Sequence, residues 1–94
     1  MKYQLLAEND VQRAFADYLR NCRETAKLSR EALAERSSVP ASTIKKFELT
    51  GQISFRQLLL LWQTLDDLRR LYAVTQHQPI EIPQSIEEVL KDGF

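Results

Sequence analysis

The stretch at residues 28–51, LSREALAERSSVPASTIKKFELTG, constrains the fold more than any other part of this chain. Ser29 is placed to cap a first short helix, and the run from Ser37 to Pro40 interrupts that helix. A second helix is predicted over 41–49, and Gly51 is suited to end it in the left-handed conformation. The sequence therefore predicts two short helices joined by a tight break.

Four apolar side chains in this stretch are spaced to hold the two helices, crossed, against one core: Leu33, Val39, Ile44 and Phe47. The polar residues at the start of the second helix then point outward: Ser42, Thr43, Lys45 and Lys46. Short hydroxyl donors and lysines in such a place suit a helix that lies in a DNA groove.

Composition favours a single all-α domain. The chain has 94 residues, 44% of them hydrophobic, with only two glycines and three prolines to support the turns of a β-rich fold. The lone Cys22 excludes an internal disulfide and a cysteine-rich zinc site. We find no apolar run near the roughly 20 residues of a membrane span and no signal peptide at the start, so we expect no membrane association and a cytoplasmic protein.

The formal net charge is zero, but the charges are unevenly distributed. Residues 20–56 carry eight Lys and Arg against four Asp and Glu. After Ile80 the chain has four acidic residues and only Lys91 as a base. A basic middle permits local phosphate contacts even though the sum is neutral.

Further helices are predicted on both sides of the central stretch. Asn9 with Gln12 has capping-box spacing, so a helix should begin near Asp10. Its predicted buried stripe is Val11, Ala14, Phe15, Tyr18, Leu19, Cys22 and Ala26. A second capping box, Ser54 with Gln57, starts a helix whose expected inward face is Phe55, Leu58, Leu59, Trp62 and Leu65, with Leu60 and Leu61 left over. Asp66 and Asp67 fit the start of a fifth helix.

The two ends of the chain are predicted to lie outside this domain, which we place at 8–73. Residues 1–7 alternate weakly and fit either a short strand or an extended arm. The tail at 74–94 begins with a polar, proline-containing segment in which Ile80 and Ile82 alternate around Glu81 and could add as a strand to another element. A third capping box, Ser85 with Glu88, predicts a short helix over 85–91.

Residues 20–65 resemble the helix-turn-helix domain of the Xre and Cro/repressor family. The segment LSREALAERSSVPASTIKKFE matches the family pattern of Leu-Ser, Leu-Ala, Val, Thr-Ile and a closing Glu. The continuation Lys-Phe-Glu-x-Thr-Gly, with Ser54 starting the next helix, is similar to HipB-like antitoxins. The resemblance implies a five-helix repressor-type domain that binds palindromic operators as a homodimer. From the lone Cys22 and the isolated His77 we expect no cofactor or metal.

The resemblance also implies roles for individual residues. Arg30, two places into the first motif helix, is expected to contact a DNA phosphate. The start of the recognition helix, which reads bases or backbone, maps to Ala41, Ser42 and Thr43. Lys45 and Lys46 follow one turn later and can reach the groove, and Lys46 is the favoured base contact. Glu48 is interpreted as a partner of Arg23 or Arg36 within the domain.

The chain departs from the family pattern at four positions. Arg30 replaces the usual Gln, Ser38 the usual turn Gly, and Pro40 the usual Ser or Thr cap. A left-handed Ser38 would cost about 1 kcal/mol, which favours a different turn geometry. Ala41 removes a side chain that often reads bases, so DNA shape is expected to carry part of the specificity.

Catalytic chemistry has little support in the sequence. We find no Gly-rich phosphate loop, carboxylate pair or His-based dyad, and His77 has no second His or Cys near it, so we expect no enzyme activity. The functional prediction is a bacterial sequence-specific repressor, and more narrowly an antitoxin-type autoregulator of a toxin-antitoxin operon. The alternative is a protein-interaction module that docks a HipA-like toxin kinase, motivated by Leu60, Leu61 and the acidic tail.

Overall fold

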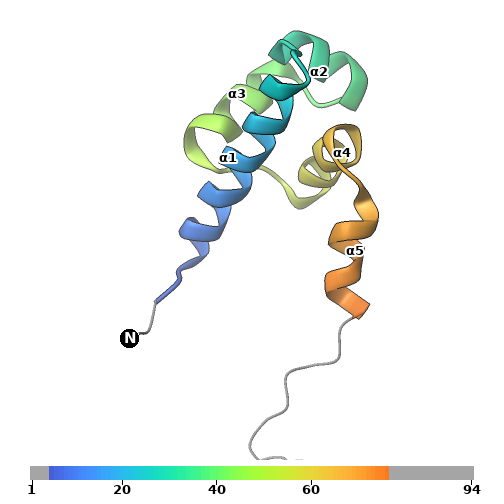
Figure 1. Cartoon of the computed structure of the whole chain (residues 1–94). Coiled ribbons are helices and arrows are strands. Elements are labelled where there is room, and N and C mark those ends of the chain that lie inside the picture. The colour runs from blue at the N-terminus through green and yellow to red at the C-terminus, as the bar shows by residue number, and fades with distance from the viewer. Residues whose placement is uncertain (1–4, 77–94) are drawn as a thin grey trace, which may run out of the picture.

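The computed structural model describes residues 5–76 and places five helices there (Figure 1). They are α1 (Glu8–Thr25), α2 (Arg30–Ser37), α3 (Ala41–Thr50), α4 (Phe55–Leu65) and α5 (Leu68–Gln76). This part of the chain contains no strand. The predicted all-α, five-helix architecture is confirmed. No helix in the described range has the length and apolar character needed to cross a membrane.

The predicted caps of α2 and α4 are confirmed. The Ser29 hydroxyl accepts a hydrogen bond from the backbone N–H of Ala32 at 3.0 Å, and the Ser54 hydroxyl accepts one from that of Gln57 at 3.1 Å. Each bond satisfies one amide that a helix start leaves without a backbone partner.

The start of α1 differs from the prediction. Ala7 occupies the cap position, and its backbone N–H donates to the Asp10 carboxylate at 2.9 Å. Asn9 therefore lies inside the helix instead of capping it. Two acidic residues in the first turn, Glu8 and Asp10, favour the earlier start because they lie at the positive end of the helix dipole.

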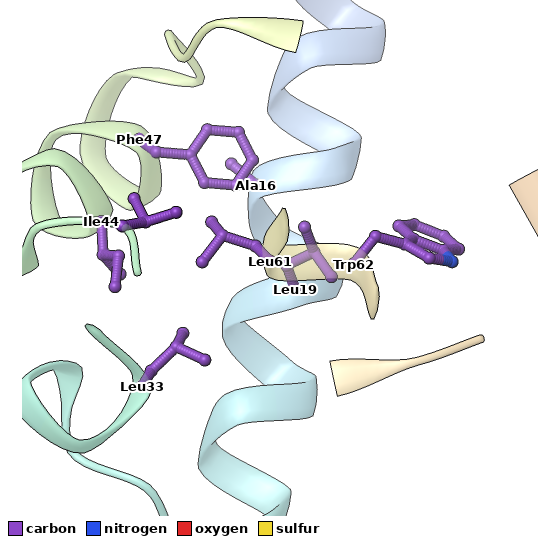
Figure 2. Close-up of a cluster of buried hydrophobic side chains, with 8 residues drawn as sticks. Ala16, Leu19, Leu33, Ile44, Phe47, Leu61 and Trp62 are labelled. Atoms are coloured by element: carbon purple, nitrogen blue, oxygen red, sulfur yellow. The ribbon is translucent and has the colours of Figure 1, made fainter. Parts of the chain in front are cut away.

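The core lies where α1, α2, α3 and α4 meet (Figure 2). The four side chains predicted to join the two motif helices are all buried, each at most 1% exposed. The other core members come from α1 and α4. The complete buried set is Ala16, Leu19, Leu33, Val39, Ile44, Phe47, Leu61 and Trp62.

The buried face of α1 is rotated from the predicted stripe. Ala16, Leu19 and Arg23 are buried, whereas Cys22 is half-buried and four predicted members are exposed: Val11, Ala14, Tyr18 and Ala26. The rotation follows from Arg23, whose guanidinium pairs with a carboxylate on α3 and so turns its side of the helix inward. Apolar periodicity alone could not include an arginine in the inner face.

The inward face of α4 is also corrected. Leu61, predicted to be surplus, is 1% exposed, and Leu60 packs against the core. Phe55, predicted to be inward, is 72% exposed. Leu58, Leu61 and Leu65 form the stripe at steps of three and four that meets the other helices, and this places Phe55 and Leu59 at its edge.

The α2–α3 turn is left-handed at Ser38, at φ 68°, the conformation for which glycine is best suited. The hydroxyl of the buried Ser37 accepts a hydrogen bond from the Val39 N–H at 3.1 Å and secures the turn. The expectation of a different turn geometry is therefore wrong.

Gly51 ends α3 as predicted, at φ 83°. A Cβ there would lie 3.2 Å from the backbone carbonyl carbon of Gln12 on α1. The turn after α3 thus packs directly on the backbone of α1.

The fifth helix begins directly after Asp66 and Asp67, as predicted, and the Asp67 carboxylate accepts a hydrogen bond from the Arg69 N–H at 2.9 Å. The helix continues to Gln76. Residues 5–7 precede α1 without regular structure. The helix predicted over 85–91, the alternation around Glu81 and the first four residues lie outside the described range.

Replacing Ser38 with glycine should stabilise the protein. Glycine adopts a positive φ without the steric cost that an L-side chain bears, so the free energy of unfolding should rise by about 0.5–1 kcal/mol. Chemical denaturation of the two proteins measures the difference. Ser42→Gly, at an exposed helical position, is the matched control and should lose about 0.5–1 kcal/mol. Destabilisation by both changes would contradict the assigned strain at Ser38.

Candidate nucleic-acid interface

The exposed side of α3 carries the residues predicted to meet DNA. Ser42, Lys45 and Lys46 are exposed, and Ala41 and Thr43 are half-buried. On the opposite side of the same helix, Ile44 and Phe47 are buried in the core. The helix therefore presents a polar, positively charged face to solvent and is held from behind by apolar contacts.

A shallow hollow of about 410 Å³ joins part of this face to the turn after α3 and to α4. Ser42, Thr43 and Lys46 line it from α3, and Gln52 and Gln57 line it from the other side. Side-chain amides can pair bidentately with an adenine edge in the major groove. The site thus has a second set of potential base readers beside the predicted ones.

Sequence reasoning missed the two glutamines for identifiable reasons. The sequence indicates Gln57 only as the closing residue of a capping box, and its amide oxygen does accept a hydrogen bond from the Ser54 hydroxyl at 3.2 Å. Its amide NH2 group stays available to a ligand. Gln52 follows Gly51, and only the left-handed turn at that glycine brings it back to α3. Its backbone N–H donates to the Thr50 hydroxyl at 3.0 Å, which secures the turn.

The first turn of α3 has no side-chain cap, because Pro40 stands at the cap position. The backbone N–H groups there are consequently open to an outside acceptor, at the positive end of the helix dipole. This is the chemical environment in which helix starts bind phosphate oxygens.

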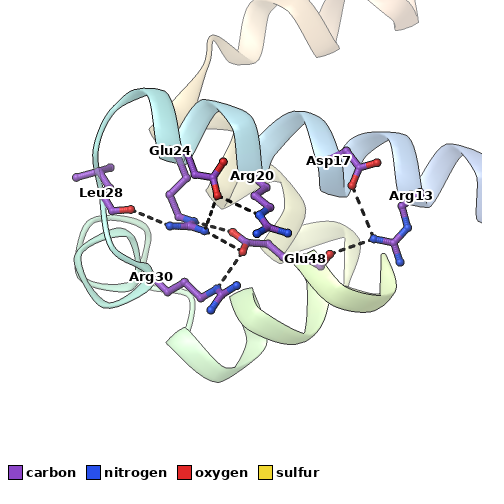
Figure 3. A network of polar contacts seen from close by, with 8 residues as sticks. Arg13, Asp17, Arg20, Glu24, Leu28, Arg30 and Glu48 are labelled. Atoms are coloured by element: carbon purple, nitrogen blue, oxygen red, sulfur yellow. Dashed lines mark hydrogen bonds and ion pairs between the residues drawn. The ribbon is translucent and has the colours of Figure 1, made fainter.

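Glu48 anchors α3 to α1 and α2 from the buried side (Figure 3). Its carboxylate accepts hydrogen bonds from Arg23 at 2.7 and 3.0 Å and from the Nε of Arg30 at 2.9 Å. The Glu48 side chain is 3% exposed and that of Arg23 is 10% exposed. Arg23 also donates to the Leu28 carbonyl at 2.9 Å. The predicted partnership with Arg23 is confirmed, and the second partner is Arg30, not Arg36.

The two arginines determine the charge of this carboxylate. Burial by itself would raise the pKa of Glu48, but the hydrogen bonds from Arg23 and Arg30, together with their positive charges, outweigh burial and lower that pKa. Since the pKa is lower in the folded protein than in the unfolded chain, the ion pair stabilises the fold above the unfolded value of about 4.3. That contribution is lost as pH falls through the folded-state pKa.

Arg30 occupies the first position of α2 and is partly accessible, with 30% of its side chain exposed. Its Nε is engaged by Glu48, whereas its two terminal nitrogens make no hydrogen bond to residues 5–76. A guanidinium held at Nε can still present two donors to a phosphate. The predicted phosphate contact of Arg30 remains a prediction, and the structure is compatible with it.

Arg13 secures the other end of α3. Its guanidinium donates to the carbonyl of Glu48 at 3.0 Å and to that of Leu49 at 2.6 Å, and it lies 3.8 Å from the Asp17 carboxylate. These carbonyls belong to the last turn of α3, where the C=O groups have no N–H donor within the helix and a cation is favourable. The long α1 thus holds α3 at both a side chain and the backbone.

Residues 5–76 contain no group of three or more His, Cys, Asp or Glu side chains arranged to hold a metal ion. His77 lies just beyond this range.

Comparison with known protein families identifies one match. A family model described as a helix-turn-helix domain matches residues 14–78, which is more than half of the chain. Searches of curated proteins and of solved structures found no match.

Glu48→Gln should destabilise the protein in a pH-dependent way. At pH 7 the change leaves the buried Arg23 without its counter-charge, so the free energy of unfolding should fall by about 3 kcal/mol. As pH falls below the unfolded value of about 4.3 and through the lowered pKa of Glu48, the native carboxylate becomes protonated as well, and the difference should shrink. Denaturant melts at several pH values measure it.

Glu35→Gln provides the control, because Glu35 is exposed on α2. It should change stability by less than about 0.5 kcal/mol at any of these pH values. A Glu48→Gln penalty that stays constant from pH 7 to pH 3 would contradict the ion-pair assignment.

Proposed function

This chain belongs to the helix-turn-helix domain family, and on that premise we propose that it is a sequence-specific transcriptional repressor. The observation that carries the proposal is the hollow on α3, where Ser42, Thr43 and Lys46 face Gln52 and Gln57. All five side chains offer hydrogen-bond donors suited to base edges. The helix that bears three of them is fixed on its buried side by Arg23 and Arg13.

In the proposed complex α3 enters the major groove with its polar face toward the bases. Lys46 donates to the O6 and N7 acceptors of a guanine, and the Ser42 and Thr43 hydroxyls meet neighbouring base edges. Ala41 has no polar side-chain atom, so its methyl group suits apolar contact with a thymine methyl. Lys45 and Arg30 flank this surface and bind phosphates, which sets the register of the helix on the duplex.

Shape contributes to specificity in this proposal. With alanine and proline at the entry to α3, few side chains at its start can read bases directly. A helix held this rigidly cannot adapt to a mismatched groove, so the deformation energy of the operator becomes part of the discrimination.

The narrower role that we propose is a bacterial, cytoplasmic, antitoxin-type autoregulator that binds the promoter of its own operon and acts without catalysis. Its support is the similarity of residues 46–51 and Ser54 to HipB-like antitoxins. The alternative of toxin docking draws on Leu60 and Leu61 as surplus apolar groups and on the acidic tail. Since Leu61 is buried and Leu60 packs on the core, the apolar part of that argument no longer holds, and the acidic tail lies outside the described residues.

Lys46→Ala should weaken binding to the promoter duplex by about 1–3 kcal/mol and leave binding to a scrambled duplex nearly unchanged. The reason is that Lys46 lies in the hollow among the base-reading candidates. Fluorescence anisotropy at moderate, fixed salt measures both affinities.

Arg69→Ala is the matched control, since it removes one positive charge from α5, away from α3 (Figure 1). It should leave promoter affinity within about twofold, as expected for a distant charge screened by salt. Equal affinity of the native protein for promoter and scrambled duplexes would refute sequence-specific repression.

We also propose that the protein acts as a homodimer on a palindromic site. One α3 of ten residues is about 15 Å long and reads only a half-site, whereas two such helices can lie about 34–36 Å apart on one face of the duplex. Sedimentation equilibrium at micromolar concentration should give the mass of a dimer. A monomer mass that does not depend on concentration, both with and without promoter DNA, would exclude this arrangement.

A further inference from the structure

A groove of about 680 Å³ lies between α5 and the edges of α4 and α1. Phe55 and Leu59 line it from α4, and Leu71, Tyr72 and Val74 line it from α5. Its charged lining residue is Arg69. This surface is separate from the polar hollow on α3, with which it shares no lining residue.

The apolar side chains of the groove are only partly covered. Phe55 is 72% exposed, Tyr72 is 64% exposed and Val74 is 65% exposed. Exposed apolar residues are ordinary when scattered, but a contiguous set that lines one concave surface marks a binding site.

The fifth helix needs more support than residues 5–76 supply. It has nine residues, none of them buried, and a helix of this length is marginal in water without packing on one face. Its first turn is tied down, since Arg70 donates to the Tyr18 hydroxyl at 2.9 Å and to the Asp66 carboxylate at 2.6 Å. The last turn of α5 contains Val74 and Thr75, and both side chains line the groove.

We propose that residues 80–90 of the same chain dock in this groove and cover its apolar side chains. This segment carries apolar residues at two kinds of spacing. Ile80 and Ile82 alternate around Glu81, and Ile86, Val89 and Leu90 recur at steps of three and four after the capping box that begins at Ser85. The DNA-binding role does not explain this pattern, whereas a contact with an apolar groove does.

Charge complementarity supports the same occupant. After Ile80 the tail holds Glu81, Glu87, Glu88 and Asp92 against Lys91, a net charge of −3. The groove side offers Arg69, whose side chain is 89% exposed, and no acidic residue lines the groove. Arg69 is paired with the Asp67 carboxylate through Nε and one terminal nitrogen, and its other terminal nitrogen makes no hydrogen bond within residues 5–76. A carboxylate of the acidic segment laid in the groove would thus pair with that nitrogen at the rim.

The length of the connecting chain is sufficient. The three residues at 77–79, between Gln76 and Ile80, span up to about 10 Å when extended, and Val74 and Thr75 in the last turn of α5 line the groove. Ile80 can therefore reach the groove at the end of α5, and the rest of the segment can continue along it. Docking within one chain also gains from the high effective concentration of a short linker.

Val89→Asp in the full-length chain tests the proposal from the tail side. The residue lies outside the helix-turn-helix core, so the domain should still fold. We expect the NMR signals of Tyr72 and Val74 to shift and the amide exchange of α5 to accelerate by about tenfold or more, as one buried valine is lost. Lys91→Gln changes the net charge by the same amount on the opposite side of the predicted helix, and should leave both readouts unchanged.

Val74→Asp tests it from the groove side, and the methyl signals of Val89 and Leu90 should shift in response. Unchanged tail signals here, or unchanged groove signals in Val89→Asp, would overturn the proposal. Groove signals that move on tenfold dilution of the native protein would assign the groove to a second copy of the chain and would equally overturn docking within one chain. Promoter binding is measured separately, so failure of the repressor proposal leaves these results interpretable.

Discussion

The buried carboxylate of Glu48 holds together three of the five helices. It is the acceptor for Arg23 of α1 and Arg30 of α2, and it belongs to α3, so one side chain links the long helix to both halves of the motif. A buried charge without partners would cost several kcal/mol, so Glu48 and Arg23 can be buried only together, with the partly exposed Arg30 as a further donor. The rotation of α1 follows from the same requirement, since Arg23 must face inward.

The contacts that hold α3 in place lie on its buried side and at its last turn, and they leave its exposed face open to a ligand. The helix is held by apolar contacts at Ile44 and Phe47, by the carboxylate of Glu48 and by Arg13 at its last carbonyls. None of these interactions uses Ser42, Lys45 or Lys46, which stay available for a ligand. The protein thus separates the groups that position the helix from those that we propose to meet DNA. Arg30 would belong to both sets, since its Nε is bound to Glu48 while its terminal nitrogens make no hydrogen bond to residues 5–76 (Figure 3).

The sequence correctly predicted those features of the fold that neighbouring residues determine, namely the buried positions of the motif and two helix caps. Leu33, Val39, Ile44 and Phe47 are buried as expected, and Ser29 and Ser54 cap their helices, because a short range of sequence contains each signal. The errors arose where long-range contacts decide. The inward turn of Arg23 and the burial of Leu61 depend on partners in distant helices. Gln52 and Gln57 reach the candidate site through a left-handed turn, so spacing gave no indication that they face α3.

Pro40 leaves α3 without a side-chain cap, and this has a consequence for how binding and order are coupled. In α2 and α4 a serine hydroxyl accepts a hydrogen bond from a backbone N–H of the first turn, so the cap comes from the protein itself. In α3 the completing acceptor would have to come from outside, and a DNA phosphate is one such group. The nucleic acid would then act as the missing cap. Such a contact would satisfy the open amides of that first turn, so the start of α3 would be more stable on the operator than in free solution, while the core already fixes the rest of the helix.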